Sequence, residues 1–176
     1  VYPDGFTHLD CWGRTCWDRD PVGRDVKFFD VLVGALAESY CVDPARVFSI
    51  GHSRGGRFVE VLACNRAKRH LAFASIGAGG NNVKACDASA PIWLSHSVKD
   101  EVVAFREGEA HRDAWAVRNG CDRAPPSDVL DACTEIPGCP RENSTIWCPT
   151  REEDWKGHAL PGLADEEIWK FFSSMP

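Results

Sequence analysis

Residues 46–56 read Arg-Val-Phe-Ser-Ile-Gly-His-Ser-Arg-Gly-Gly, and this stretch decides the fold. Its first half, residues 46–50, is a short run that contains Val47, Phe48 and Ile50, β-branched and aromatic residues typical of a strand. The segment that follows, from about Gly55 to Asn65, has the apolar spacing of a helix. The sequence therefore predicts a strand that turns sharply into a helix, with Ser53 at the turn.

The turn matches the pattern G-x-S-x-G over residues 51–55. In a nucleophile elbow, this pattern places a serine hydroxyl on a strained bend where only small flanking residues avoid clashes. The helix aims its first N–H groups at a developing oxyanion, so the backbone N–H of Arg54 is the expected oxyanion donor. Simple glycine-rich turns also show this pattern, but its place between a strand and a helix favours Ser53 as a nucleophile.

Strands and helices alternate along the rest of the chain. Helical spacing covers residues 25–40, about 55–65, 110–118 and 165–173, and strand-like runs cover 46–50, 71–76, 91–96 and 145–148. Residues 6–23 read as loop. This alternation predicts an α/β fold, a mostly parallel sheet with helices on both faces. Because no repeat or long linker interrupts it, we expect residues 1–176 to form one domain.

A serine nucleophile needs a base, and the base needs an acid that orients it. In the fold that carries this elbow, these residues follow the chain order Ser, then Asp or Glu, then His. His158 lies in a loop after the last predicted strand, which is where this order puts the base. His70 and His96 precede the best acid candidate, and His111 lies in a predicted helix, where we expect it to be a solvated surface residue.

The best acid candidate is Asp100. It follows the predicted strand at residues 91–96 and precedes an apolar pair, Val102 and Val103. The alternative is an ordinary surface carboxylate in a turn. The sequence therefore predicts a catalytic triad of Ser53, His158 and Asp100, and chemistry that requires no metal or organic cofactor.

Composition excludes several kinds of partner. The formal net charge is −6, whereas nucleic acids and anionic membranes are bound by basic surfaces. The longest apolar run, residues 31–37, is far too short to span a bilayer. We therefore expect no nucleic-acid partner and no membrane association.

The nine cysteines contain no C-x-x-C pair, so disulfides are favoured over a metal site. Disulfides form in oxidising compartments, which predicts a secreted protein, and a sequon that begins at Asn143 predicts a glycosylation site.

One disulfide follows from geometry. The predicted strand rises about 16 Å before Ser53, and the helix descends about 15 Å to Cys64, so that Cys64 returns to the level of Cys41. We therefore expect a Cys41–Cys64 bridge. The cysteines at 121, 133, 139 and 148 are expected to pair among themselves or with Cys86.

Linked motifs along the chain resemble a known family, the extracellular feruloyl esterases and polyhydroxybutyrate depolymerases. The motifs are CVDPxRV (41–47), GHSxGG (51–56), LAC (62–64), HxxxDxVV (96–103), RNGC (118–121) and GHxxPG (157–162). The resemblance runs from about Tyr2 to the C-terminus. It implies an α/β-hydrolase fold and a serine esterase that uses Ser53, Asp100 and His158. Its members act on feruloyl or acetyl esters of plant cell-wall polysaccharide, or on polyhydroxyalkanoates.

The chain departs from the family pattern at several points. Ser97 stands where the family usually has Gly, Lys156-Gly157 precedes the catalytic His where the family usually has Gly, and Leu160 replaces a Trp. Residues 1–5 resemble the end of an early strand. The resemblance therefore implies an N-terminally incomplete hydrolase, without the first strands and without the loop that supplies a second oxyanion donor.

Two other functions fit parts of the sequence. A non-catalytic or truncated homologue could bind polysaccharide through exposed tryptophans, for which Trp12 and Trp17 in a polar loop are the candidates. Trp93 and Trp169 fit strand and helix patterns and are expected in the core. A serine peptidase on the same scaffold is the second alternative, because triad geometry does not choose between ester and amide.

Overall fold

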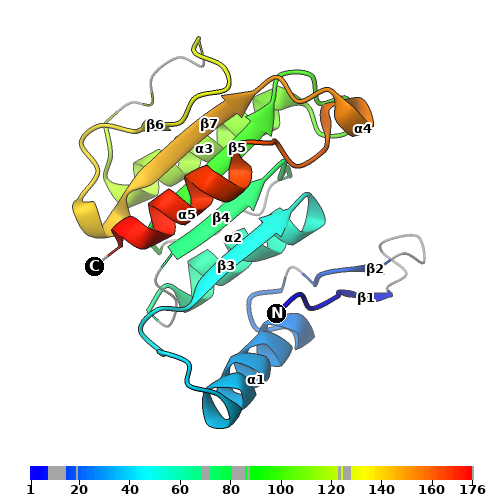
Figure 1. Ribbon diagram of the computed structural model, residues 1–176, viewed down its shortest axis with the longest axis vertical. Helices are drawn as coiled ribbons and strands as arrows, with labels where there is room; N and C mark the ends of the chain where they lie inside the picture. The colour runs from blue at the N-terminus through cyan, green and yellow to red at the C-terminus, as the bar shows by residue number, and fades with distance from the viewer. Residues whose placement is uncertain are drawn as a thin grey trace.

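The computed structural model describes residues 1–7, 15–18, 20–68, 72–80, 86, 88–122, 124 and 128–175. Its main feature is a five-stranded sheet of order β3-β4-β5-β7-β6 (Figure 1). Strands β3 (Phe48–His52), β4 (Ala72–Ile76), β5 (Ile92–Ser97) and β7 (Thr145–Thr150) are parallel, and β6 (Thr134–Glu135) is antiparallel to β7. The predicted α/β class with a mostly parallel sheet is confirmed.

Helices cover both faces of this sheet. They are α1 (Arg24–Ser39), α2 (Arg54–Arg66), α3 (Phe105–Asn119), the short α4 (Asp154–Gly157) and α5 (Ala164–Ser174), with a 3-10 turn at Arg141–Asn143. Figure 1 shows α5 in front of the sheet and α2 and α3 behind it. Within the described ranges, no helix combines the length and apolarity needed to cross a membrane.

Alternating side chains of the strands form two separate cores. Phe73, Leu94 and Trp147 pack with α2 and α3 on one face. Ala74, Trp93 and Cys148 pack with α5 on the other. Both faces are buried because each strand alternates its side chains between two helical layers, and this leaves only the ends of the strands for a site.

Several local expectations were wrong. Part of the expected loop at residues 6–23 is a small antiparallel pair, β1 (Phe6–Thr7) with β2 (Thr15–Cys16). Helix α3 begins at Phe105, five positions before the predicted start at 110. Its Gly108 lowers helix propensity, but a Cβ there would lie 2.5 Å from His96 Nδ1, so the close approach of α3 to β5 requires glycine.

One of the two tryptophans expected in the core is exposed. Trp93 is fully buried, as predicted, whereas Trp169 is 68% exposed. Helix α5 turns Ile168, Phe171 and Phe172 toward the sheet, and this i, i+3, i+4 spacing directs the intervening Trp169 to solvent.

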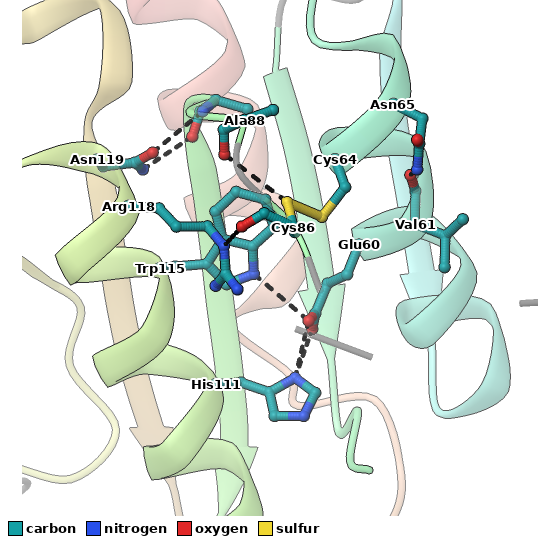
Figure 2. The surroundings of a disulfide bond; sticks show 11 residues. Glu60, Val61, Cys64, Asn65, Cys86, Ala88, His111, Trp115, Arg118 and Asn119 are labelled. Atoms are coloured by element: carbon teal, nitrogen blue, oxygen red, sulfur yellow. Dashed lines mark hydrogen bonds and ion pairs between the residues drawn. A yellow bond between two sulfur atoms is a disulfide. The ribbon is translucent and has the colours of Figure 1, made fainter. Parts of the chain in front are cut away.

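The predicted Cys41–Cys64 bridge is wrong. Cys64 is bonded to Cys86 instead, as Figure 2 shows, and Cys41 is exposed with a free thiol. The height of Cys64 along the sheet did not fix its direction around the α2 axis. Cys64 packs on the α2–α3 core beside Ala88, whereas Cys41 follows α1 on the exposed surface.

The expected pairing among the later cysteines is confirmed. Cys121 is bonded to Cys139, and Cys133 is bonded to Cys148. The second of these bridges joins the segment before β6 to β7, and so fixes the edge of the sheet from which the chain continues to His158.

Candidate active site

Ser53 lies at the bend between β3 and α2. It caps α2 with φ of 55° and ψ of −114°, a strained conformation for a residue with a side chain. Its backbone N–H donates to the Ile76 carbonyl at 2.8 Å. A Cβ at Gly51 would lie 2.2 Å from the Gly55 carbonyl oxygen, so the bend closes only with glycine at that position. The strand and helix thus force the Ser53 hydroxyl to the carboxyl end of the sheet.

His158 meets Ser53 from a distant part of the chain. It follows α4, and its Nε2 lies 2.7 Å from Ser53 Oγ. Its Nδ1 lies 2.6 Å from Asp100 Oδ2. The imidazole therefore bridges a hydroxyl and a carboxylate, and the structure brings together the three residues that the sequence singled out.

Asp100 is held by backbone donors just after β5. Its Oδ1 accepts hydrogen bonds from the N–H groups of Val102 at 2.8 Å and Val103 at 2.7 Å. Its Oδ2, which faces His158, also lies 3.2 Å from His96 Nε2. A carboxylate accepts hydrogen bonds, so this geometry suits the His158 tautomer in which Nδ1 donates to Asp100 and Nε2 accepts from the Ser53 hydroxyl.

Two other histidines, His52 and His96, lie beside the group formed by Ser53, His158 and Asp100. Burial and the nearby His158 lower the pKa of His52, whose ring centroid lies 4.9 Å from that of His158. Burial also lowers the pKa of His96. Both rings therefore stay neutral near pH 7, so neither opposes a positive charge that develops on His158.

The loop that carries His158 has an unusual backbone. Trp155, Lys156 and Gly157 have φ values of 52°, 61° and 72°, all in the left-handed region. The Lys156 carbonyl accepts a hydrogen bond from the Glu101 N–H at 2.9 Å, next to the acid. This contact ties the His158 loop to the Asp100 loop, and the strain is located where a fixed ring orientation is needed.

The expected oxyanion donor, the N–H of Arg54, lies in the first turn of α2, where helical N–H groups have no partner within the helix. The Arg54 side chain turns away and donates to the Thr15 carbonyl of β2 at 3.2 Å. The side chain is thus engaged by β2, and the role of the Arg54 backbone N–H as an oxyanion donor stays a prediction.

The open side of Ser53 is the side available to a substrate. The pocket behind the triad, lined by His96, Asp100 and His158, has a volume of only about 10 Å³. A larger hollow of about 540 Å³ lies between β7 and α5 and includes none of the triad residues. Neither hollow thus leads a ligand to Ser53, whose half-buried side chain is reached from solvent.

The sequence also suggested Trp12 and Trp17 as sugar-binding residues and Asn143 as a glycosylation site. Trp12 lies outside the described residues. Trp17 is half-buried and stacks on Phe58 at 4.6 Å between centroids, so the core takes up part of its surface, and its sugar-binding role stays a prediction. Asn143 ends a 3-10 turn and is half-buried, and its glycosylation stays a prediction.

His111 is not a surface residue, and this expectation was wrong. It is 4% exposed, and it bonds to Glu60, a carboxylate that is 1% exposed. The missed signal was the segment Phe58–Ala63 of α2, which is apolar on every side except for one acid. A charged residue in such a run requires a buried partner.

Comparisons with known proteins find relatives in sequence and in fold. No family model matches the chain. Feruloyl esterase D of Neurospora crassa is 30% identical over 86% of this chain and 56% of its own length, and a probable feruloyl esterase C of Aspergillus clavatus is 31% identical over 85% and 57%. The chain thus spans just over half the length of these curated relatives.

Solved structures show the same fold. An acetyl xylan esterase from Aspergillus awamori superposes with a TM-score of 0.65 over 90% of this chain and 73% of its own, at 15% identity. A thermostable esterase gives a TM-score of 0.61 over 85% of this chain and 36% of its own. The chain therefore has the α/β-hydrolase fold of these esterase structures, and in sequence it is similar to feruloyl esterases over most of its length.

Proposed function

We propose that residues 1–176 are the catalytic domain of a secreted serine esterase that hydrolyses carboxylic esters through Ser53, His158 and Asp100. One observation carries the proposal: the continuous hydrogen-bonded path from Asp100 through His158 to a hydroxyl at a strained elbow. The names of the relatives, feruloyl esterase and acetyl xylan esterase, support the reaction class.

Acylation begins with a proton transfer from the Ser53 hydroxyl to His158 Nε2 as the serine oxygen attacks the ester carbonyl carbon. The carbonyl oxygen becomes an oxyanion and faces the backbone N–H of Arg54. Asp100 stabilises the imidazolium through Nδ1. When the tetrahedral intermediate collapses, the bond to the alcohol breaks, and the imidazolium gives its proton to the leaving oxygen.

Deacylation repeats these steps with water. His158 takes one proton from the water, whose oxygen attacks the acyl-enzyme carbonyl. Collapse of this second intermediate breaks the bond to Ser53 Oγ, which recovers its proton from His158 and releases the acid. Every proton that leaves one oxygen arrives on another, so no cofactor takes part.

The substrate that we propose is a feruloyl or acetyl ester on plant cell-wall polysaccharide. Three apolar side chains near Asp100 and His158 are largely exposed: Val102 at 59%, Trp155 at 84% and Leu160 at 58%. Such exposed apolar and aromatic groups beside an open nucleophile suit a phenolic acyl group or a sugar ring better than they suit a charged substrate.

Secretion is supported by the cysteines. The disulfides at Cys64–Cys86, Cys121–Cys139 and Cys133–Cys148 need an oxidising compartment. A glycan on Asn143 is part of the same proposal.

The test is turnover of matched substrates by the purified chain and by Ser53→Ala. We expect hydrolysis of methyl ferulate or acetylated xylan, irreversible labelling of Ser53 by an aryl phosphonate, and loss of both in the variant. Full activity in Ser53→Ala would refute the mechanism. Binding to insoluble xylan without any hydrolysis would identify a non-catalytic, polysaccharide-binding homologue. Faster cleavage of a peptide anilide than of an aryl ester would identify a peptidase. Turnover of polyhydroxybutyrate alone would show that the substrate is this polyester and not a cell-wall ester.

A further inference from the structure

A second buried polar cluster lies outside the triad, on the α2–α3 side of the sheet (Figure 2). Its centre is the Glu60 carboxylate of α2, which accepts hydrogen bonds from Ser75 Oγ of β4 at 2.8 Å and from His111 Nδ1 of α3 at 2.8 and 2.9 Å. Trp115 Nε1, also on α3, lies 3.4 Å from the same carboxylate. The cluster thus joins two helices and a strand through one acid.

His111 is the member of this cluster that reaches beyond it. Its second nitrogen, Nε2, lies 2.8 Å from the Gly80 carbonyl oxygen. A carboxylate and a carbonyl both accept hydrogen bonds, so both ring nitrogens donate and the ring is positively charged. Burial opposes this charge, but the Glu60 carboxylate and the Gly80 carbonyl outweigh burial and raise the pKa of His111.

Gly80 is held on both sides of its backbone. Its carbonyl accepts from His111, and its N–H donates to Glu107 Oε2 at 2.7 Å. It lies in a loop described at residues 77–80, where three of four residues are glycine, with φ of 57° at Gly77 and 100° at Gly80. Because glycine restricts the backbone least, the Gly80 end of this loop relies on these contacts from α3, whereas the Gly77 end is tied to β5 by its N–H, which donates to the Ser95 carbonyl at 2.9 Å.

The other end of this loop lies against the triad. A Cβ built on Gly77 would lie 3.4 Å from His158 Cε1, so the Gly77 backbone backs the imidazole ring. The residue before it, Ile76, accepts the hydrogen bond from the Ser53 N–H. A shift of the loop would therefore be transmitted to the ring that must stay aimed at Ser53.

We propose that Glu60 and His111 are a positioning pair, which holds Gly80 so that the loop at residues 77–80 keeps the His158 ring in line with Ser53. The pair touches neither the substrate nor the reacting atoms and acts through His158. The kinetic part of this inference rests on the proposed esterase function.

A role in folding alone would not call for this arrangement. A buried ion pair repays its desolvation poorly, and an apolar pair of the same volume is often as stable. What an apolar pair cannot supply is a donor for the Gly80 carbonyl. The placement of that donor, three residues from the backbone that supports His158, is therefore the feature to test.

The test is the double variant Glu60→Gln/His111→Phe in the full chain. Gln still accepts from Ser75 and Trp115, Phe fills the volume of the imidazole, and the Gly80 carbonyl loses its donor. We expect kcat on methyl ferulate to fall about ten- to a hundredfold with KM nearly unchanged. We also expect the low-field proton resonance of His158 Nδ1–H to shift or broaden, and the amide proton of Gly80 to exchange faster with solvent.

A second variant, Glu107→Ala, removes the half-buried carboxylate that accepts from the Gly80 N–H. It should change kcat, the His158 resonance and the Gly80 exchange rate in the same direction but by less.

Asn119→Ala is the matched control. Asn119 lies on the same helix and is 1% exposed, but it bonds to Ala90 and Thr145 at the other end of α3. It should lower stability and leave kcat and the His158 resonance as they are. The proposal is overturned if the double variant keeps the wild-type kcat and resonance, or if Asn119→Ala changes them equally at the same loss of stability. If the chain cleaves no ester, the esterase function fails, and the resonance and amide exchange decide the positioning role by the same criteria.

Discussion

Two buried carboxylate–histidine pairs within the described chain look alike and differ at one atom. In the first, Asp100 Oδ2 lies 2.6 Å from His158 Nδ1, and in the second, Glu60 Oε2 lies 2.8 Å from His111 Nδ1. Both histidines are at most 9% exposed. The difference is the partner of the other ring nitrogen, which is the Ser53 hydroxyl for His158 and the Gly80 carbonyl for His111.

This difference decides what each pair can do. A hydroxyl can donate as well as accept, so His158 Nε2 can stand unprotonated and take the proton of Ser53. A carbonyl can only accept, so His111 Nε2 must keep its proton and has no capacity for another. A buried acid–histidine pair is therefore not a sign of catalysis by itself, because the group beyond the histidine determines whether the ring is a base or a fixed cation.

The largest expected effect comes from converting each acid to its amide. Asp100→Asn should reduce kcat by about 10⁴-fold, because the amide no longer holds the proton on Nδ1 and the ring loses the tautomer that accepts from Ser53. The free energy of unfolding should change little, since the amide oxygen still accepts from Val102 and Val103. Steady-state kinetics and urea unfolding of the same preparation give both numbers.

Glu60→Gln is the matched substitution in the other pair, with the opposite expected balance. It removes the only carboxylate bonded to His111 in the described cluster, and breaking a buried pair costs about 3 kcal/mol of stability or more. The activity that remains in the folded fraction should be far above that of Asp100→Asn. Equal losses of kcat in the two variants would erase the distinction drawn between the pairs.

The triad could be predicted because its logic is carried by the chain. The elbow occupies consecutive residues, and the order Ser53, Asp100, His158 is the order known for the fold that carries this elbow. The α/β class follows similarly from the alternation of strand and helix patterns. These inferences need periodicity and chain order, which a sequence contains.

The wrong predictions for Cys64 and His111 share a different cause, because a sequence does not fix the direction in which a side chain points around its helix axis. The Cys41–Cys64 prediction used height along the sheet and lacked the rotation of α2 that points Cys64 at Cys86. His111 was assigned to the surface because it lies in a predicted helix, and its contact with Glu60 shows that it faces the core. Pairwise meetings of this kind depend on packing between elements that are distant in sequence.

The pH dependence of stability should also separate the two regions. Burial lowers the pKa values of His52 and His96 beside the triad, so their contribution is complete above the ordinary histidine pKa of 6.5 and is lost as the pH falls below it. The pKa of His111 is raised, so its contribution is complete below 6.5 and is lost as the pH rises through the raised value.

Unfolding by urea from pH 5 to pH 9 measures both the fall in stability at acid pH (the acid limb) and the fall in stability at alkaline pH (the alkaline limb). The groups that face His111 are Glu60 and Arg57 of α2, His96 of β5, the Gly80 carbonyl, and Trp115 on its own helix. Glu60→Gln/His111→Phe should flatten the alkaline limb and leave the acid limb in place. An alkaline limb that persists unchanged in this variant would assign it to another group.

The smallest expected effect is at Gly77, where the two regions meet. Gly77→Ala forces a side chain into a φ of 57°, which costs about 1 kcal/mol, and brings a methyl group 3.4 Å from His158 Cε1. We expect a drop in kcat smaller than that of Glu60→Gln/His111→Phe, since the loop keeps its clamp at Gly80. Gly34→Ala in α1 is the control, because its site is open and the change should raise stability by roughly 0.5–1 kcal/mol without altering kcat. If Gly77→Ala lowers stability as stated and leaves kcat at the wild-type value, the loop does not transmit its position to His158, and the link between the two pairs is broken at its last step.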